Sequence, residues 1–470
     1  MTFTRYKKIY NKTYAYQVWK EKDQNGKWKQ KSKYLGVINP QTNTYNKKPT
    51  TTKQEQQILD YGDTYLLNNI TKQLPIYNIL KTTFTTHFDT LMSLVFHRIT
   101  TNQAMQHAEK WYNGNYIQHL YSKAQTTSQD ISKFLTYLGR ENIQRAFFLS
   151  YIPLVCTGKS SVVIDSIGLP NEINLSVTNW GYHNGGIEYE TRLILAVERL
   201  SELPLYFRYV VGNVGDVRAL ANAIAEMKKQ GISTSSALID AGYYSEANLK
   251  LFFDVGISFL IRVPSNRVVY KEVVVQNMDV ESARFVVAFG KRGLFVKEVE
   301  VVVCGRKVFG YLVLDPLRRG QEVSRAVLDV EENISRFGVS GDFSGCGKMV
   351  LLSSERLRCD EVVPLYYTRQ VVEGLFGIVE DDLGILSLCT HSEFNFKGFM
   401  MFVFISLVVL CGVKARLGKK IGIEQALVTL RNLKCKVFDD QIILSEVTKE
   451  QRLILETTNT MVPKIRICPQ

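Results

Sequence analysis

The sequence lacks the features that mark secreted, zinc-binding and membrane proteins. Its eight cysteines are scattered from Cys156 to Cys468 without a CxxC pair, which argues against a disulfide framework or a zinc site and favours free thiols in a reducing compartment. The first residues, MTFTRYKKIY, contain no apolar signal core. The fifteen residues from Phe399 to Val413 form a long apolar run, but a membrane span usually needs about 20. We therefore expect a cytoplasmic protein without membrane contact, in which this run is a buried helix.

Acidic residues are scarce in the first fifty positions, where only Glu21 and Asp23 accompany twelve lysine and arginine residues. Most of the net charge of +13 carried by the 470-residue chain lies in this segment. Such a balance suits a polyanionic partner such as nucleic acid, and a solvated, solubilising surface is the alternative.

The chain is long enough for about two to four domains, and its pattern changes along the sequence. Residues 1–50 predict a basic β-hairpin or small meander, because aromatic and polar residues alternate on both sides of the turn Asn25-Gly26. The return strand carries four lysines that could lie on a DNA backbone or on the solvated face of an ordinary sheet: Lys27, Lys29, Lys31 and Lys33.

Residues 51–155 show helical periodicity. In the phrase SQDISKFLTYL, for example, Ile131, Phe134 and Leu138 fall on one face of a helix. Short helices at this spacing could include a DNA-binding helix-turn-helix or could form a packing domain, and the pattern does not decide between them.

Residues 156–264 predict the element order strand, strand, strand, helix, strand, helix, strand. Asp165 ends the first strand after the apolar run Val162-Val163-Ile164, and Asp240 ends the fourth after Ala237-Leu238-Ile239. This is the element order of a ribonuclease-H-like domain, in which those two strands are neighbours. We therefore expect the two carboxylates to lie close together.

The remaining segments complete the expected α/β fold class. Val-rich alternating runs over 265–358 predict an all-β insertion. Residues 359–430 return to the ribonuclease-H-like domain with a helix that begins at Asp360 and continues through Glu373, followed by the apolar helix. Residues 431–470 form a C-terminal tail for which the sequence gives no clear prediction.

Three residues on the predicted helix share one face, because Tyr366, Arg369 and Glu373 fall at positions i, i+3 and i+7. Glu373 can join Asp165 and Asp240 in a set of oxygen ligands that suits a hard cation such as Mg²⁺ or Mn²⁺, and paired metals support phosphodiester chemistry. The alternative is structural: the aspartates begin loops, and Glu373 pairs with Arg369 on a solvated helix face.

In this constellation the chain resembles the DDE transposases of bacterial insertion sequences, in particular the IS4-like group. That group carries Tyr, Arg, Glu and Lys at spacings of three, four and seven on its last catalytic helix. The phrases VVGNVGD, IDAGYYSEANL and HSEFNFKGFM are similar as well, and the hairpin YAYQVWKEKDQNGKWKQKSKYLG resembles the IS1634 subgroup. The resemblance covers most of the chain.

The resemblance implies a transposase that cuts insertion-sequence ends and joins them to target DNA by Mg²⁺- or Mn²⁺-dependent transesterification. Asp165 would bridge two metal ions, while Asp240 and Glu373 would each hold one. Arg369 would orient a carboxylate or clamp a phosphate, and Tyr366 would bond a phosphate or stack on a displaced base. Residues 51–155 would bind the element ends, and we expect a homodimer on double-stranded DNA at the bacterial nucleoid.

The sequence departs from the family pattern at one position of the last helix. Glu380 stands where the family has lysine, and an acid there would repel phosphate. Two alternatives therefore stay open: a catalytically impaired, DNA-binding relic of a transposase, and a nuclease of the same fold that cuts DNA but does not join strands.

Overall fold

The structure is a computed structural model that describes most of the chain. It covers residues 2–9, 12–22, 28–38, 45–46, 57–156, 158, 160–171, 178–183, 186–211, 216–334, 343–384, 392–418, 421–438, 441–464 and 466–467. The chain divides into two compact units. The first comprises Met1–Ile58, Lys436–Ile443 and Ile465–Gln470, and the second comprises Leu59–Cys435 and Leu444–Lys464.

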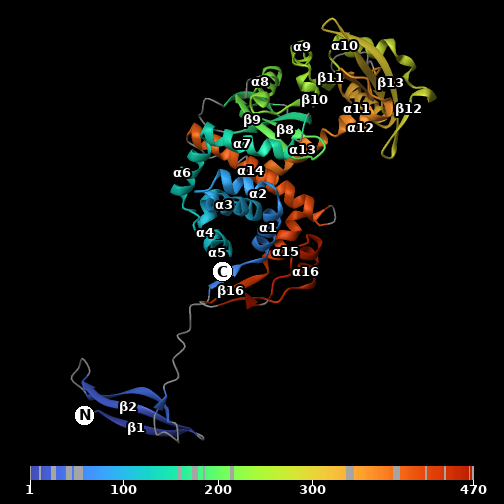
Figure 1. Ribbon diagram of the computed structural model, residues 1–470. Helices are drawn as coiled ribbons and strands as arrows, with labels where there is room; N and C mark the ends of the chain where they lie inside the picture. Colours follow the sequence, from blue (N-terminus) through green and yellow to red (C-terminus); the bar gives the residue numbers. More distant parts are fainter. Residues whose placement is uncertain are drawn as a thin grey trace. The chain divides into compact units, whose positions relative to one another are not determined.

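The first unit contains an antiparallel sheet whose strands follow chain order: β1 (Thr2–Ile9), β2 (Lys12–Lys22), β3 (Trp28–Ile38) and β4 (Tyr45–Asn46) (Figure 1). A bulge in β3 opposite Ala15 and Tyr16 shifts the register between β2 and β3. Ala15 and Val18 are buried, whereas β1 and most of β3 are exposed. A small sheet with so little buried area leaves both of its faces open to partners.

Residues 57–155 form one short strand and a series of helices: β5 (Gln57–Asp60), α1 (Gly62–Gln73), α2 (Ile76–Thr83), α3 (Phe88–Thr101), η1 (Met105–His107), α4 (Ala108–Asn113), α5 (Ile117–Leu120), α6 (Ser128–Leu138) and α7 (Glu141–Val155). The predicted apolar face of α6 is buried at Ile131, Phe134 and Leu138. Thr127 caps this helix by accepting a hydrogen bond from the backbone N–H of Asp130.

The next elements follow the predicted order: β6 (Ser160–Pro170), β7 (Asn179–His183), β8 (Gly186–Glu198), β9 (Pro204–Val211), α8 (Asp216–Lys229), β10 (Thr234–Ile239), η2 (Ala241–Tyr243), α9 (Glu246–Val255) and β11 (Ser258–Val263). The strand β7, between the first and second expected strands, is an addition to that order. Ser245 caps α9, and Gly256 ends it with a φ of 73°, a backbone conformation that favours glycine.

The segment predicted as an all-β insertion also contains helices: α10 (Val268–Gln276), η3 (Met278–Val280), η4 (Ala283–Phe285), β12 (Val286–Phe289), β13 (Arg292–Val303), β14 (Arg306–Leu314), α11 (Pro316–Ile334) and β15 (Lys348–Ser353). The all-β prediction is therefore wrong in detail. The β propensity of valine suggested a strand at α10, but Tyr270, Val273 and Val274 are buried at helical spacing. At α11, the Asp315 carboxylate accepts hydrogen bonds from the backbone N–H groups of Leu317 and Arg318.

Among the described residues, ten strands form one mixed sheet, in the order β12-β13-β14-β15-β11-β10-β6-β8-β7, with β9 paired to β8. The insertion strands thus continue the sheet that carries the two aspartates. β10 lies in parallel between β6 and β11. The fold is mixed α/β, as expected for a ribonuclease-H-like domain.

The C-terminal elements are α12 (Cys359–Tyr367), α13 (Gln370–Gly377), the π-helical turn η5 (Ile378–Asp382), α14 (Glu393–Leu417), α15 (Ile423–Arg431), β16 (Lys434–Val437), β17 (Ile442–Leu444), α16 (Lys449–Thr457) and β18 (Arg466–Ile467). The single helix predicted from Asp360 through Glu373 is two helices, because the chain turns at Thr368 and Arg369. The first helix begins at Cys359, with Arg358 rather than Asp360 as its N-cap.

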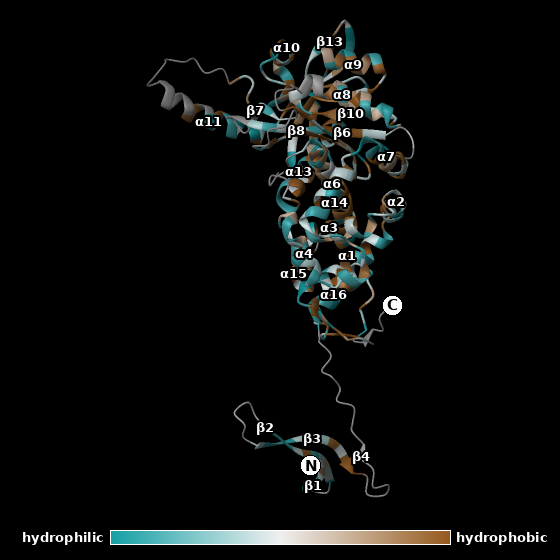
Figure 2. Cartoon of the chain, turned by 90° about the vertical axis from the view of Figure 1, so that its left-hand side faces the viewer, coloured by the Kyte–Doolittle hydropathy of each residue, from teal (hydrophilic) through white to brown (hydrophobic). Residues whose placement is uncertain are grey.

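The helix α14 forms the centre of the helical region, where it contacts α1, α3 and α6 (Figure 2). It is long and apolar enough to cross a membrane by length and composition, but most of its apolar segment is buried inside the protein. Gly139 and Gly398 allow α6 and α14 to approach closely, since a Cβ at either position would collide with backbone of the other helix. The predicted buried helix is confirmed.

Candidate active site

Asp165 and Asp240 are neighbours because of strand register. Asp240 directly follows β10, whereas Asp165 lies within β6 rather than at its end. The two strands pair in parallel with Ile164 beside Ile239. The next residue of each strand therefore lies at the same level of the sheet, and these residues are the two aspartates.

The junction between α12 and α13 supplies the other side of the site. Tyr366 lies in the last turn of α12, Arg369 is the N-cap residue of α13, and Glu373 lies in the first turn of α13. A carboxylate in the first turn of a helix is stabilised by the helix dipole. The junction thus presents all three side chains to the sheet although the helix is broken.

Arg369 contacts all three carboxylates. Its Nη1 lies 3.0 Å from Oδ2 of Asp165 and 3.7 Å from Oδ2 of Asp240, and its Nη2 lies 2.9 Å from Oε1 of Glu373. We call these four residues together with Tyr366 the acidic centre. The sequence anticipated only the contact with Glu373 from i,i+4 spacing; the two aspartates lie more than a hundred residues away along the chain.

Tyr366 holds Asp240 in place. Its hydroxyl donates a hydrogen bond to Oδ1 of Asp240 at 3.1 Å, and the residue is only 3% exposed. Burial and the charge of Asp240 raise the pKa of Tyr366 far above its ordinary value, so the phenol remains a donor. The structure gives Tyr366 a positioning contact, in place of the exposed ring that base stacking would require.

Burial sets the charge balance of the acidic centre. The side chain of Asp165 is 14% exposed, and desolvation raises its pKa to about 6 despite the backbone N–H of Ser166 and the nearby Arg369. Desolvation also disfavours the charged form of Arg369, but Asp240, Tyr366, Asp165 and Glu373 outweigh it and raise the pKa of this guanidinium. The centre therefore holds its cation firmly, while burial makes the charged form of Asp165 less favourable than that of a solvated aspartate.

The sequence comparison with protein families now decides the class of the chain. Residues 157–409 match the transposase DDE domain family. The chain belongs to this family. The match spans more than half of the chain and includes the five residues of the acidic centre.

Comparisons with individual proteins add little to this assignment. The solved structures that match the transposase include the cryo-EM structure of a piggyBac transposase synaptic complex with hairpin DNA. The two share 12% sequence identity with a TM-score of 0.37, over 78% of this chain and 70% of that chain. No curated protein matches the sequence.

DDE transposases generally use divalent metal ions, and the donor set here is compatible with one. Three carboxylates offer the oxygen ligands that hard cations prefer. Within the described ranges, however, no group of three His, Cys, Asp or Glu side chains is already closed into a metal-binding arrangement. Arg369 lies among the carboxylates, so metal binding by the transposase would require it to give up at least part of its contacts.

Three of the four lysines predicted to bind DNA belong to the sheet of the first unit, whereas the acidic centre belongs to the second unit. Lys29, Lys31 and Lys33 are exposed and alternate along β3, and Lys31 forms an ion pair of 2.6 Å with Glu21 of β2. Lys27 lies outside the described residues. The register places the three described lysines on one face of the sheet, opposite Glu21, Trp19 and Gln17.

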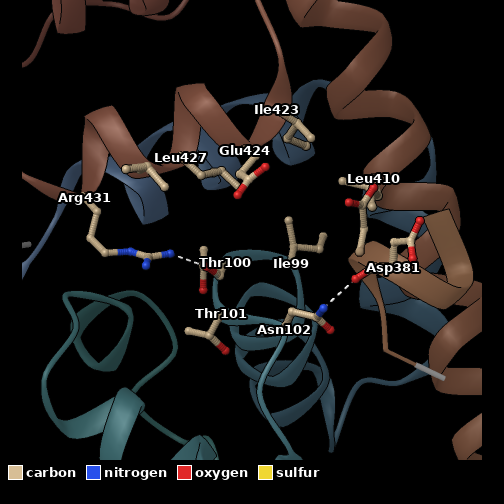
Figure 3. A pocket seen from close by; sticks show the side chains of 12 residues that line it. Ile99, Thr100, Thr101, Asn102, Asp381, Leu410, Ile423, Glu424, Leu427 and Arg431 are labelled. Carbon is tan, nitrogen blue, oxygen red and sulfur yellow. Dashed lines mark hydrogen bonds between the residues drawn. The ribbon is translucent and has the colours of Figure 1, made fainter. Parts of the chain in front are cut away.

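A cavity of about 390 Å³ lies among α3, η5, α14 and α15, and none of the acidic-centre residues lines it (Figure 3). Internal partners hold several of the polar groups at this cavity: Asn102 donates to the carbonyl oxygen of Asp381, Arg431 pairs with Asp63, and Lys414 pairs with Asp382. This arrangement indicates a structural cavity between helices of the transposase.

Proposed function

We propose that this chain is a DNA transposase that cuts the ends of its own element and joins them to target DNA by transesterification with Mg²⁺ or Mn²⁺. Family membership supports the class of reaction. The observation that carries the assignment of residues is the convergence of Asp165, Asp240 and Glu373 on one guanidinium. The motif around Glu373 favours the IS4-like group, and the N-terminal hairpin sequence favours its IS1634 subgroup.

In this proposal the carboxylates are the metal ligands. Asp165 would bridge two ions, and Asp240 and Glu373 would each hold one, with Tyr366 fixing the orientation of Asp240. Bound divalent ions neutralise the scissile phosphate, activate water or a 3′-hydroxyl, and stabilise the leaving oxygen.

Arg369 has two roles in succession. Before metal binds, it screens the mutual repulsion of the three carboxylates and keeps them at one place. Once the carboxylates have other partners, its planar fork is available for a phosphate oxygen of the DNA, to which guanidinium groups bind in a bidentate manner.

The rest of the chain would supply DNA recognition. Residues 51–155 and the basic first unit would bind the element ends, and a homodimer would hold two ends together on double-stranded DNA. The setting would be the bacterial cytoplasm, at the nucleoid.

The test compares Asp240→Asn with Asp254→Asn, which changes an exposed aspartate of α9 in the same way. Labelled duplexes that contain the flanks of the gene are incubated with Mg²⁺ or Mn²⁺. Asp240→Asn should abolish strand cleavage and keep DNA binding, whereas Asp254→Asn should behave like the parent. Cleavage by the Asp240→Asn protein would remove the assignment.

Glu380 favours a second candidate, the DNA-binding relic, because it places an acid at the lysine position of the family, in the turn η5 beside Asp381 and Asp382. If Glu380→Lys cleaves DNA and the parent does not, the parent is a relic. Efficient cleavage by the parent excludes that view. A nuclease that never joins strands would cut the duplex but give no joined product from pre-cut ends.

A further inference from the structure

The sheet of the first unit presents two chemically different faces. Side chains of paired residues point to the same side of a sheet, and neighbours along a strand alternate. The register of β1, β2 and β3 therefore sorts their residues. One side, which we call the cation–ring face, carries the cations Arg5, Lys7, Lys12, Lys20 and Lys22 and, among its rings, the exposed ones of Phe3, Trp28 and Tyr34. The lysine face on the other side carries Lys8, Lys29, Lys31 and Lys33 together with Glu21.

The rings of the cation–ring face are open to solvent. Phe3 is 55% exposed, Trp28 is 65% exposed and Tyr34 is 39% exposed. Tyr34 rests on Tyr16 with ring centroids 5.4 Å apart, and the ammonium of Lys22 lies 5.3 Å from the centroid of Trp28. Exposed apolar groups gathered on one face mark an interaction surface, because their hydration costs free energy that a partner can recover.

The charges on this face identify the kind of partner. In the described part of the sheet, no acidic residue lies on the cation–ring face, whereas Glu21 lies on the lysine face. Glu21 pairs with Lys31 at 2.6 Å and stands opposite Lys29 in the register. Part of the positive charge of the lysine face is thus balanced within the protein, whereas no ion pair between described residues involves a cation of the cation–ring face, whose charge suits a polyanion.

We propose that the cation–ring face, and not the lysine face, is the surface of the first unit that contacts double-stranded DNA. This inference rests on the proposed function for its choice of polyanion. A two-stranded β-ribbon fits the major groove. Arg5, Lys20 and Lys22 would contact phosphates, while the exposed Gln30 and Ser32, which lie on the same face, can form hydrogen bonds to base edges.

The decisive experiment compares two triple variants of the full chain that each remove three charges from one sheet. Arg5→Gln/Lys20→Gln/Lys22→Gln alters the cation–ring face, and Lys29→Gln/Lys31→Gln/Lys33→Gln alters the lysine face. Binding to a labelled duplex oligonucleotide is measured by fluorescence anisotropy over a range of salt concentrations. Far-UV circular dichroism and thermal unfolding check that both variants keep the sheet.

The first variant should make the negative slope of log K against log salt shallower by about 2.7 and weaken binding about a hundredfold at physiological salt, because each phosphate contact contributes about −0.9 to the slope. The lysine-face variant should change the slope by less than about one unit. Equal losses, or a larger loss for the lysine-face variant, would overturn the proposal.

A ring variant tests the face without a change of charge. Trp28→Leu should weaken binding several-fold and leave the salt slope unchanged, since an aromatic ring releases no counterions. Tyr6→Leu is the control, because Tyr6 is 59% exposed but lies on the lysine face. Loss of affinity for Tyr6→Leu but not for Trp28→Leu would contradict the assignment.

The experiments distinguish a wrong assignment of the DNA-binding face from a wrong assignment of the transposase activity. If Asp240→Asn abolishes cleavage while the cation–ring variant binds like the parent, the acidic centre stands and the face assignment falls. If the parent binds vesicles of anionic phospholipid through this face and binds no duplex, the partner is a membrane surface and the proposal is wrong.

Discussion

Two regions of the second unit each enclose an arginine. In one region carboxylates surround the guanidinium, and in the other an apolar core surrounds it. In the acidic centre, Arg369 contacts three carboxylates. In the helical core, Arg98 of α3 is 2% exposed, and within the described structure its Nε and Nη1 have no hydrogen-bond partner. The guanidinium of Arg98 lies 5.8 Å from the ring of Phe399. Burial lowers the pKa of Arg98 to about 10, whereas the pKa of Arg369 is raised.

The difference between the two regions lies in whether buried polar groups have partners. Beside Arg98, His97 is fully buried, and its two ring nitrogens have no partner among the described residues. Desolvation, Arg98 and His107 lower the pKa of His97 to about 4. A buried polar group without a partner costs stability. The acidic centre, by contrast, brings opposite charges into direct contact.

The largest expected effect separates the two regions by activity. Glu373→Gln removes a carboxylate of the acidic centre, so cleavage should fall by more than about 10³-fold, or about 4 kcal/mol of transition-state stabilisation. Arg98→Met should leave cleavage near the parental rate. Single-turnover cleavage of a labelled duplex measures both. A large loss in Arg98→Met alone would reverse the comparison.

Arg369→Met should destabilise the metal-free protein by about 3 kcal/mol, mainly because it leaves the largely buried carboxylate of Asp165 without its cation. Ca²⁺ should then restore more stability to this variant than to the parent, since the carboxylates no longer have a competing partner. Urea unfolding with and without Ca²⁺ gives both numbers. An Arg369→Met protein as stable as the parent, with the same response to Ca²⁺, would show that Arg369 does not hold the centre together.

In contrast to Arg369→Met, Arg98→Met should stabilise the protein by about 1–2 kcal/mol. Arg98 is a buried cation that has no hydrogen-bonded carboxylate among the described residues, and methionine replaces it with an apolar chain of similar length. The same urea unfolding experiment measures it. Destabilisation by more than about 1 kcal/mol would mean that Arg98 has a stabilising partner in the folded protein.

The smallest effect concerns His97 and depends on pH. Its folded-state pKa of about 4 lies below the ordinary 6.5, so its contribution to stability is complete above about pH 6.5 and is lost as the pH falls towards 4. His97→Phe should remove about 1 kcal/mol of acid sensitivity between pH 7 and 5.5. Urea unfolding at each pH measures this, and equal acid sensitivity of parent and His97→Phe would contradict the prediction.

Local patterns in the sequence were sufficient for much of this fold. The order of strands and helices from β6 to β11 follows from periodicity and from residues such as Ser245 and Gly256 at the ends of α9. That order in turn placed Asp165 and Asp240 on neighbouring strands. The contact between Arg369 and Glu373 also follows from spacing, because it lies within one helical turn.

The remaining features of the fold depend on contacts between residues that are distant in the sequence. Valine content suggested a strand at α10, but burial of one helical face prevailed. The strands β12 to β15 joined the catalytic sheet because β15 pairs with β11, a choice that no local pattern specifies.

The sequence by itself determined the candidate acids and the elements that carry them, because these depend on residues close together in the chain. Only the tertiary structure decided that Arg369 reaches Asp165 across 204 positions, that Tyr366 is buried against Asp240, and that Phe3 of β1 lies on the same face of the sheet as Trp28 of β3. Register between strands and the turn between α12 and α13 fix these contacts, and both are set by packing rather than by local sequence.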